Sequence, residues 1–375
     1  MDPATLEHCI VTEIRRAREI SRRELADCIG IAKSTAGRRI DTMIARGIVV
    51  ETRIQKRQEA GRPRRMLELA SSYGSFLGFD FDSRRLYGVL TDFSQTVLTM
   101  KRVLLPENPT RQIVLSHIRE LISELQLTAP SLPILGVGIG VPGHVERATG
   151  QALWNSQIKD WENVNLPLEL DLPLEIVHLE NNTRVTAIGE YWQGRHTAIN
   201  PLVCLNIRTG LGAAIVLDGK ILDGRHEKSG EICGWKVSPG SAETDQDDSL
   251  ENVATARSII PDGPQAQAEW TQFVAECKEG DVSAIHQLDR VVRHHSDALR
   301  RIVQLIDPEA IFVAGMFLEL GAVYLDRLRT CLAEAVEDLH FDAPPIRPVT
   351  AGEFAGAVGA ASLAALQTRL PYSGI

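Results

Sequence analysis

The first 70 residues alternate short amphipathic stretches with turn residues. Apolar side chains recur at helical spacing over residues 5–18, which predicts a first helix. Ser21, followed three residues later by Glu24, forms a capping box that predicts a second helix over residues 22–28. After a turn glycine, a third helix is expected over residues 32–45. Three short helices joined by tight turns are typical of a helix-turn-helix unit.

The outward, amino-terminal side of the third helix carries hydrogen-bond donors and positive charge. A recognition helix presents such groups to base edges and phosphates when it enters the major groove. The side chains expected to contact DNA there are Lys33, Ser34, Thr35, Arg38 and Arg39.

Two short apolar runs, residues 48–50 and 66–69, read as strands on either side of a basic stretch. A hairpin wing in this place would lay Arg62 and Arg64 along a phosphate backbone or in a minor groove. We therefore expect a winged helix-turn-helix domain over residues 1–70, with double-stranded operator DNA as its partner. A small three-helix domain for protein interaction is the alternative.

The net charge of the first 70 residues differs in sign from that of the remainder. The first 70 residues carry 15 Lys and Arg against 10 Asp and Glu, and the remainder carries 25 against 39. This contrast favours a nucleic-acid module attached to a body that does not bind nucleic acid. The chain has no run of about 18 apolar residues, and its six cysteines show no paired spacing. We expect a cytoplasmic protein with reduced thiols and no membrane contact.

After a connector at residues 71–75, the pattern changes to alternating strands and helices. Three strands joined as hairpins are predicted over residues 76–81, 85–92 and 96–103. Further apolar runs bounded by turn residues cover residues 133–140, 175–179, 203–207 and 310–314. Helical periodicity fills much of the rest, so the body is expected to be an α/β structure.

Several short motifs follow one another along the body in a fixed order. They are Gly138-Ile139-Gly140-Val141-Pro142-Gly143, Asn155 with Trp161, Leu179-Glu180-Asn181-Asn182, Thr209-Gly210-Leu211-Gly212, Gly230-Glu231, Leu250-Glu251, and Gly356 with Gly359-Ala360-Ala361. In this order and spacing they resemble the ROK family (repressors, open reading frames and kinases), over essentially all of residues 75–375. The resemblance implies an actin-like (ribonuclease H-like) two-lobed sugar-kinase fold over residues 76–375, which would bind an effector and mediate dimerisation.

The resemblance also implies where a sugar would bind. Five residues fall where family members hydrogen-bond sugar hydroxyls: Asn155, Asn181, Asn182, Glu231 and Glu251. In the sugar-phosphorylating members an Asp stands at the place of Asn182 and acts as the general base. An amide can hydrogen-bond a hydroxyl but cannot accept its proton near pH 7. We therefore expect a pocket that binds a neutral or weakly charged sugar without phosphorylating it.

The two phosphate loops of the family are also altered. The loop with Thr209, Gly210 and Gly212 is preceded by Arg208, where kinase members usually carry Gly. The other loop begins at Asp80, and its glycine-rich turn has become Asp82-Ser83-Arg84, which puts a carboxylate where backbone should approach phosphate. Both changes weaken nucleotide binding, and no cofactor is expected.

A metal site is not expected either. Zinc-bearing members of the family share a Gly-Glu-x-x-His motif followed by a cluster of cysteines, and structural zinc needs four such ligands. Here Gly234 stands at the His position, and residues 238–249 contain no cysteine.

Together these features favour a DNA-binding transcriptional regulator that senses a sugar or sugar derivative and acts as a homodimer or higher homo-oligomer. A repressor is the preferred interpretation, and an activator stays open. Two alternatives stay open at this stage. One is an active ATP-dependent sugar kinase with an accessory DNA-binding domain. The other is a DNA-binding protein whose body serves only as a dimerisation scaffold.

Overall fold

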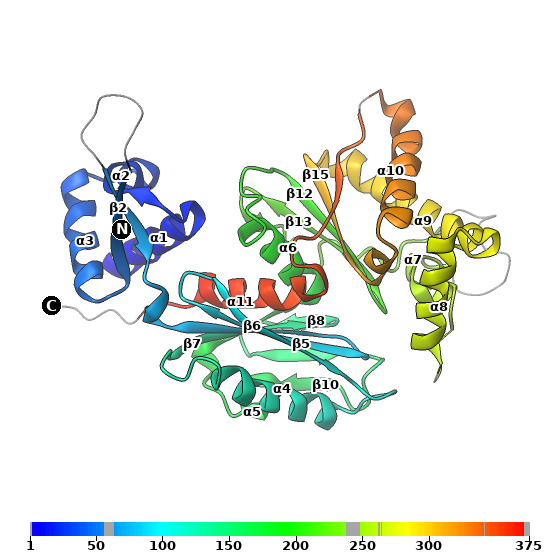
Figure 1. Ribbon diagram of the computed structural model, residues 1–375, viewed down its shortest axis with the longest axis horizontal. Helices are drawn as coiled ribbons and strands as arrows, with labels where there is room; N and C mark the ends of the chain where they lie inside the picture. The colour runs from blue at the N-terminus through cyan, green and yellow to red at the C-terminus, as the bar shows by residue number, and fades with distance from the viewer. Residues whose placement is uncertain are drawn as a thin grey trace.

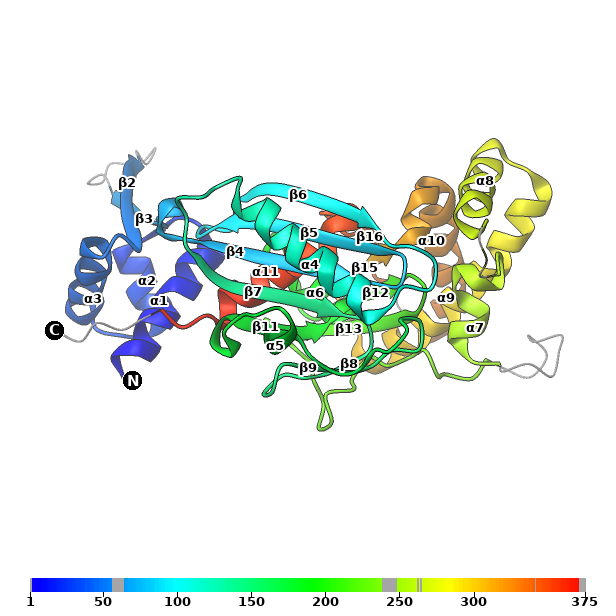
Figure 2. The ribbon, with the colours of Figure 1, turned by 90° about the horizontal axis from the view of Figure 1, so that it is seen from below.

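The computed structural model describes residues 2–55, 64–237, 248–261, 263, 265–340 and 342–370. A small amino-terminal unit lies at one end of an elongated molecule, and two lobes built on separate sheets make up the rest (Figures 1 and 2). No helix in the described ranges is long and apolar enough to cross a membrane.

The amino-terminal unit consists of three helices and a three-stranded sheet. The helices are α1 (Pro3–Ala17), α2 (Arg22–Ile29) and α3 (Lys33–Ala45), and the strands are β1 (Ile20–Ser21), β2 (Val49–Gln55) and β3 (Arg64–Leu69). The capping box at the start of α2 is confirmed. The two predicted strands are longer than expected, and β1, which pairs with β3, was not predicted. The segment between β2 and β3, with Arg62 of the predicted wing, lies outside the described residues.

The first lobe is a five-stranded sheet in the order β11-β7-β4-β5-β6. Its strands are β4 (Ser75–Phe81), β5 (Arg85–Asp92), β6 (Val97–Leu104), β7 (Ile134–Val141) and β11 (Val177–Asn181). Helix α4 (Arg111–Gln126) buries its apolar stripe against one face, and α11 (Ala355–Gln367) covers the other. A short turn of 3-10 helix, Ser71–Tyr73, joins this lobe to the amino-terminal unit.

The second lobe repeats this sheet topology in the order β14-β13-β12-β15-β16. Its strands are β12 (Leu202–Ile207), β13 (Leu211–Leu217), β14 (Lys220–Ile221), β15 (Ala310–Gly315) and β16 (Ile346–Pro348). Its apolar core includes residues of the helices α7 (Leu250–Ala254), α8 (Ala266–Glu279), α9 (Val282–Ile306) and α10 (Ala322–Val336). In each lobe three consecutive antiparallel strands are followed by two parallel ones, which is the duplicated arrangement of an actin-like fold.

A smaller sheet lies beside the first lobe. It contains β8 (His144–Glu146), β9 (Gln151–Trp154) and β10 (Glu162–Asn165), and the short helix α5 (Leu166–Glu169) follows it. Trp161 and Leu166 from this region are buried in the core of the first lobe, so the small sheet is fixed to that lobe.

The two lobes meet through a pair of helices, α6 (Asn182–Trp192) and α11, which lie between the two large sheets (Figure 1). The helices touch along their backbones. A Cβ on Gly359 would lie 1.7 Å from the carbonyl oxygen of Val185, so only glycine permits this approach. The amino terminus of α6 and the carboxyl ends of the parallel strands therefore converge between the lobes.

Helix α1 packs against the carboxyl-terminal half of α11. One continuous hydrophobic cluster joins the amino-terminal unit to the first lobe and includes Ile14, Phe93 and Ala361. Within it, the Arg15 guanidinium donates to the carbonyl oxygen of Ala365 at 2.9 Å and lies over the ring of Phe93. Burial lowers the pKa of Arg15 to about 10. The amino-terminal unit is thus docked on the helix that runs between the lobes.

Candidate functional site

A cavity of about 240 Å³, which we call the interlobe cavity, lies between the two lobes. The structure brings all five predicted sugar-binding residues to its wall: Asn155, Asn181, Asn182, Glu231 and Glu251. The predicted phosphate-loop residues Thr209, Gly210 and Gly212 line the same cavity. Residues separated by nearly one hundred positions in the sequence therefore share one site.

Strand β11 and helix α6 position the first two of these residues. Asn181 is the N-cap of α6, because its Oδ1 accepts the N–H of Thr183 at 2.8 Å. Its Nδ2 donates to the carbonyl oxygen of Gly143 at 3.0 Å, so both ends of this amide are used by the fold. Asn182 is the first residue of the helix, and its Oδ1 has only a long contact, 3.5 Å, with the Thr183 hydroxyl. Asn182 is thus the freer of the two amides to bind a ligand.

The amide of Asn155 also shapes the wall. Its Oδ1 accepts the N–H of Gln157 at 2.8 Å and closes the turn that follows β9. The side-chain nitrogen remains available as a donor toward the cavity.

Glu231 and Glu251 reach the cavity from the second lobe. The backbone N–H of Glu251 donates to the carbonyl oxygen of Cys233 at 3.0 Å, which joins the two segments. The Oε1 of Glu251 lies against Gly210, where a Cβ would meet it at 3.0 Å. Burial, together with the charges of Glu251 and Glu231, raises the pKa of the Cys233 thiol. Two carboxylates therefore face the cavity as hydrogen-bond acceptors.

A network of charges fixes the segment that precedes Glu231. Arg147 of the first lobe pairs with the buried Glu180 and, at 2.7 Å, with Asp223 of the second lobe. Arg184 of α6 is also buried and donates to Asp223 at 3.2 Å and to the carbonyl oxygen of Glu227 at 2.6 Å. Burial raises the pKa of Glu180, which the positive charge of Arg147 opposes. These contacts hold the Glu231 segment against the first lobe.

An ion pair between Arg208 and Asp80 joins the two large sheets at the inner end of the cavity. Asp80 of β4 is fully buried, and the side chain of Arg208, which directly follows β12, is 13% exposed. The other oxygen of Asp80 and one guanidinium nitrogen of Arg208 are buried without a hydrogen-bond partner among the residues that the structure describes. A Cβ on Gly356 would lie 2.0 Å from the Asp80 carboxylate, so the amino terminus of α11 also touches the pair.

Both members of this pair are charged at neutral pH. Burial raises the pKa of Asp80 to about 6, although Arg208 acts in the opposite direction. Burial alone would lower the pKa of Arg208, but the charges of Asp80 and Asp82 outweigh it and raise the value. A positive charge of the protein's own therefore occupies the place where the phosphate loops meet.

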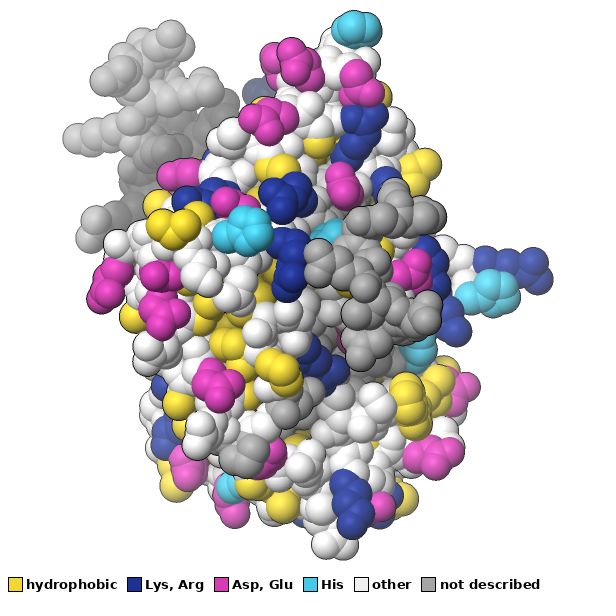
Figure 3. Space-filling view, turned by 90° about the vertical axis from the view of Figure 1, so that its right-hand side faces the viewer, with side chains coloured by type: hydrophobic (Ala, Val, Ile, Leu, Met, Phe, Trp, Pro, Cys, Tyr) yellow, Lys and Arg dark blue, Asp and Glu magenta, His cyan; other side chains and the backbone are white. Residues whose placement is uncertain are grey.

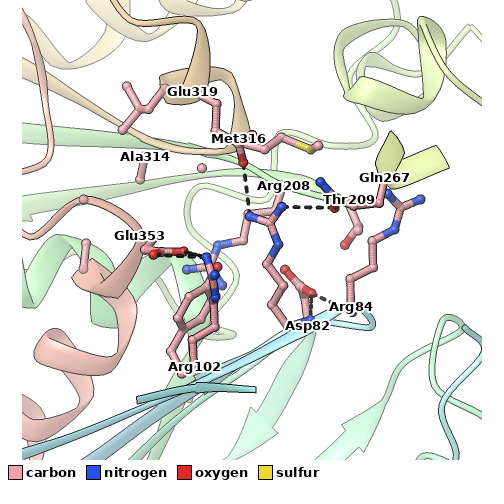
Figure 4. A pocket seen from close by; sticks show the side chains of 16 residues that line it. Asp82, Arg84, Arg102, Arg208, Thr209, Gln267, Ala314, Met316, Glu319 and Glu353 are labelled. Atoms are coloured by element: carbon pink, nitrogen blue, oxygen red, sulfur yellow. Dashed lines mark hydrogen bonds and ion pairs between the residues drawn. The ribbon is translucent and has the colours of Figure 1, made fainter. Parts of the chain in front are cut away.

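Arg208 and Thr209 also line a second cavity of about 510 Å³, the arginine-lined cavity (Figure 4). Its other arginines are Arg84, Arg85 and Arg102, and its acidic residues are Asp82, Glu319 and Glu353. Arg85 of the first lobe donates to Glu319 of the second at 3.2 Å, and Arg102 pairs with Glu353 at 2.9 Å. The positive charges of these two side chains are thus balanced within the protein.

The turn after Asp80 carries Asp82, which was expected to put a carboxylate where backbone should approach phosphate. Asp82 lines the arginine-lined cavity. Its Oδ1 accepts the N–H groups of Arg84 and Arg85, at 2.7 and 2.9 Å, and so closes the turn between β4 and β5. The carboxylate therefore takes up backbone donors that a glycine-rich loop would leave for a ligand.

The predicted DNA-contact residues lie on α3 in two different environments. Lys33, Ser34 and Arg38 are exposed, and Thr35 is half-buried. Arg39 does not point outward as expected. It pairs at 3.1 Å with Glu7 of α1, which is 3% exposed and also bonds Arg46 at 2.8 Å. Of Arg64 only the backbone is described, as the first residue of β3.

Several residues on the cavity walls were not among the predicted site residues. They are His144, Trp154, Gln157, Arg184, Asn206 and Cys233. Trp154 could have been predicted from the sequence, because it directly precedes Asn155. Arg184 could not, since a basic residue in a helix is usually exposed.

The described side chains at the far end of the second lobe carry charges of both signs. Figure 3 shows Lys and Arg side chains interspersed with Asp and Glu over this face.

The comparisons with known proteins agree with this architecture. The ROK family model matches residues 77–367. The chain belongs to the ROK family. It is 26% identical over 340 residues to a xylose repressor of Caldicellulosiruptor bescii, covering 83% of this chain and 82% of that protein. It is 26% identical over 297 residues to a glucokinase of Thermotoga maritima, covering 74% of this chain and 92% of that protein.

A solved structure described as a ROK family transcriptional regulator, a homologue of the E. coli MLC protein, has the same fold. It superposes with a TM-score of 0.76 at 22% identity and covers 98% of both chains. The match extends through the amino-terminal unit, whereas the glucokinase matches a smaller part of this chain.

Proposed function

We propose that this ROK protein is a DNA-binding transcriptional repressor whose kinase-like body binds a sugar without phosphorylating it. The observation that carries the proposal is the composition of the interlobe cavity. Its five hydrogen-bonding residues are assembled, while an amide stands at the general-base position and Arg208 stands where the phosphate loops meet. The relatives named xylose repressor support this reading and make xylose the first candidate effector.

The absence of phosphoryl transfer follows from two features. Asn182 cannot take up the proton of a sugar hydroxyl. Arg208 holds the Asp80 carboxylate in an ion pair, so this carboxylate is not free to act on a metal–nucleotide complex. An active kinase with an accessory DNA-binding domain is the less favoured function, supported by the glucokinase relative alone among those compared above.

DNA binding is assigned to residues 1–70. Lys33, Ser34 and Arg38 lie exposed on α3, in the position from which a recognition helix contacts base edges and phosphates. One such unit has a small footprint, and two-fold symmetric operators require two of them, so the active form is a homodimer.

Helix α11 provides a physical connection between the cavity and the DNA-binding unit. Gly356 in its first turn touches the Asp80–Arg208 pair, and the carbonyl oxygen of Ala365 near its end accepts the hydrogen bond from Arg15 of α1. A sugar that prefers one arrangement of the lobes would shift α11 and with it the helix-turn-helix unit. A ligand with equal affinity for both arrangements would shift nothing.

Two measurements test the proposal. Full-length protein should select specific sequences from a randomised duplex library, and a variant lacking residues 1–70 should not. A thermal-shift screen of sugars should reveal one that stabilises the protein in proportion to its concentration. Specific DNA binding that survives the deletion would refute the assignment of the domain. Turnover with ATP at about 1–100 per second, the usual range for kinases, would favour the alternative.

A further inference from the structure

The wall of the interlobe cavity carries a feature that the fold does not require. Trp154 lines this cavity and is 63% exposed. Among the aromatic residues of the described ranges it is the only exposed one, and every other is buried or half-buried. A tryptophan with this much surface in water contributes little to a core, so its place is not explained by stability.

The strand end that holds Trp154 is fixed on both sides. In β9 Trp154 lies opposite His144 of β8, while the next pair is Val145 with Ala152. The register therefore shifts by one residue at Leu153, and such irregularities redirect side chains beside binding sites. On the other side, the turn closed by Asn155 follows at once. Trp154 thus lies directly before Asn155 of the proposed sugar site and opposite His144, which also lines the cavity.

The size of the cavity limits what it can enclose. At about 240 Å³ it is smaller than typical small-molecule sites of roughly 300–1,000 Å³, so it suits a single sugar ring. A second ring attached to the first would have to lie outside this volume. The aromatic rings among the described wall residues belong to Trp154 and His144, and Nδ1 of His144 is 3.9 Å from Oε1 of Glu231.

A sugar ring has one apolar face of C–H groups and a polar edge of hydroxyls. An exposed indole offers a flat apolar surface for such a face, and the neighbouring imidazole and carboxylate offer hydrogen-bonding groups for the edge. We infer that the effector is larger than one monosaccharide: a disaccharide or other glycoside, with one ring in the interlobe cavity and the second stacked on Trp154. This inference rests on the proposed sugar-binding function and adds the chemical class of the ligand.

The test is calorimetric titration of the full-length protein with two pairs of sugars, xylose with xylobiose and glucose with cellobiose. At least one disaccharide should bind about tenfold more tightly than its monosaccharide, as expected for stacking on an aromatic ring. Trp154→Ala should weaken disaccharide binding more than monosaccharide binding and so abolish this advantage, and Trp154→Phe should retain most of it. Leu168→Ala is the control, because Leu168 is 79% exposed and does not line the cavity.

The possible outcomes distinguish a failure of this inference from a failure of the proposed function. If a monosaccharide binds and its disaccharide binds no better, the proposed function stands and the second-ring site is wrong. An equal loss of both sugars in Trp154→Ala also overturns the inference, as does a change of oligomeric state in that variant, which would make Trp154 a protein contact. If none of the four sugars binds, the proposed sugar site and the inference both fall.

Discussion

Replacing Arg208 with Met should destabilise the body strongly, because it leaves the Asp80 carboxylate buried and without its ion-pair partner. Asp80 is fully buried, and among the described residues Arg208 is the side chain that pairs with it. Removing one member of a buried pair typically costs about 3–5 kcal/mol. Since whole domains are stable by about 5–15 kcal/mol, Arg208→Met should remove a large part of the free energy of unfolding.

The double variant Asp80→Asn/Arg208→Met should recover much of this loss. It removes both charges, and replacing a buried ion pair by neutral groups of similar volume is often close to neutral in free energy. The coupling energy from the double-mutant cycle should be about 2–3 kcal/mol, near the top of the usual range for contacting residues.

Urea unfolding followed by circular dichroism measures these differences. A steric perturbation provides an independent check. Gly356→Ala places a Cβ 2.0 Å from the Asp80 carboxylate and should also destabilise the protein. Gly37→Ala in α3 is the matched helical control, because a Cβ there meets nothing within 4 Å, and it should stabilise by about 0.5–1 kcal/mol. An Arg208→Met variant with a free energy of unfolding within 1 kcal/mol of wild type would refute the view that this pair joins the lobes. A double-mutant cycle without coupling energy would refute it too.

Three further predictions concern the DNA-binding helix, the second lobe and catalysis. Arg38→Ala should weaken operator binding and lower the slope of its salt dependence by about 1. Arg39→Ala should mainly lower the free energy of unfolding, by about 1–3 kcal/mol, because Arg39 bonds the buried Glu7. Equal effects of the two variants on DNA binding at unchanged stability would contradict this. Burial lowers the pKa of His295 from 6.5 to about 4, so the unfolded chain takes up this proton first as the pH falls. The stability due to neutral His295 is complete above pH 6.5 and should be lost, by about 3 kcal/mol, as the pH falls toward 4, and unfolding curves across this range should show a smaller loss in His295→Gln. Asn182→Asp alone should not produce kinase turnover in an ATP-coupled assay, because Arg208 still pairs with Asp80; turnover at ordinary kinase rates in this variant would show that the ion pair does not block the site.

Much of the architecture could be predicted because local chemistry and global fold agree. The capping box of Ser21 and Glu24 marks the start of α2 in the sequence, and the structure forms both of its hydrogen bonds. The five residues of the proposed sugar site came from the resemblance to the ROK family, and the structure brings all five to the wall of one cavity.

The features that were missed depend on packing between distant segments. The Arg208–Asp80 pair joins residues 128 positions apart, and nothing local to either one reveals the other. Arg38 and Arg39 are neighbours on a helix, so about 100° of rotation separates an exposed side chain from one turned toward α1, and composition alone does not decide which is which. The Arg15 contact that docks the amino-terminal unit on α11 spans 350 positions, and the helical pattern of α1 gives no sign of it.

The most direct test of the account is the operator affinity of the full-length protein with and without a sugar that binds it. The affinity should change by about 5- to 150-fold at saturating sugar, corresponding to a typical coupling of about 1–3 kcal/mol. Glu231→Ala, which removes a carboxylate from the interlobe cavity, should abolish the response while leaving sugar-free DNA binding unchanged. A sugar that binds the cavity of the wild-type protein and leaves operator affinity unchanged would contradict the account.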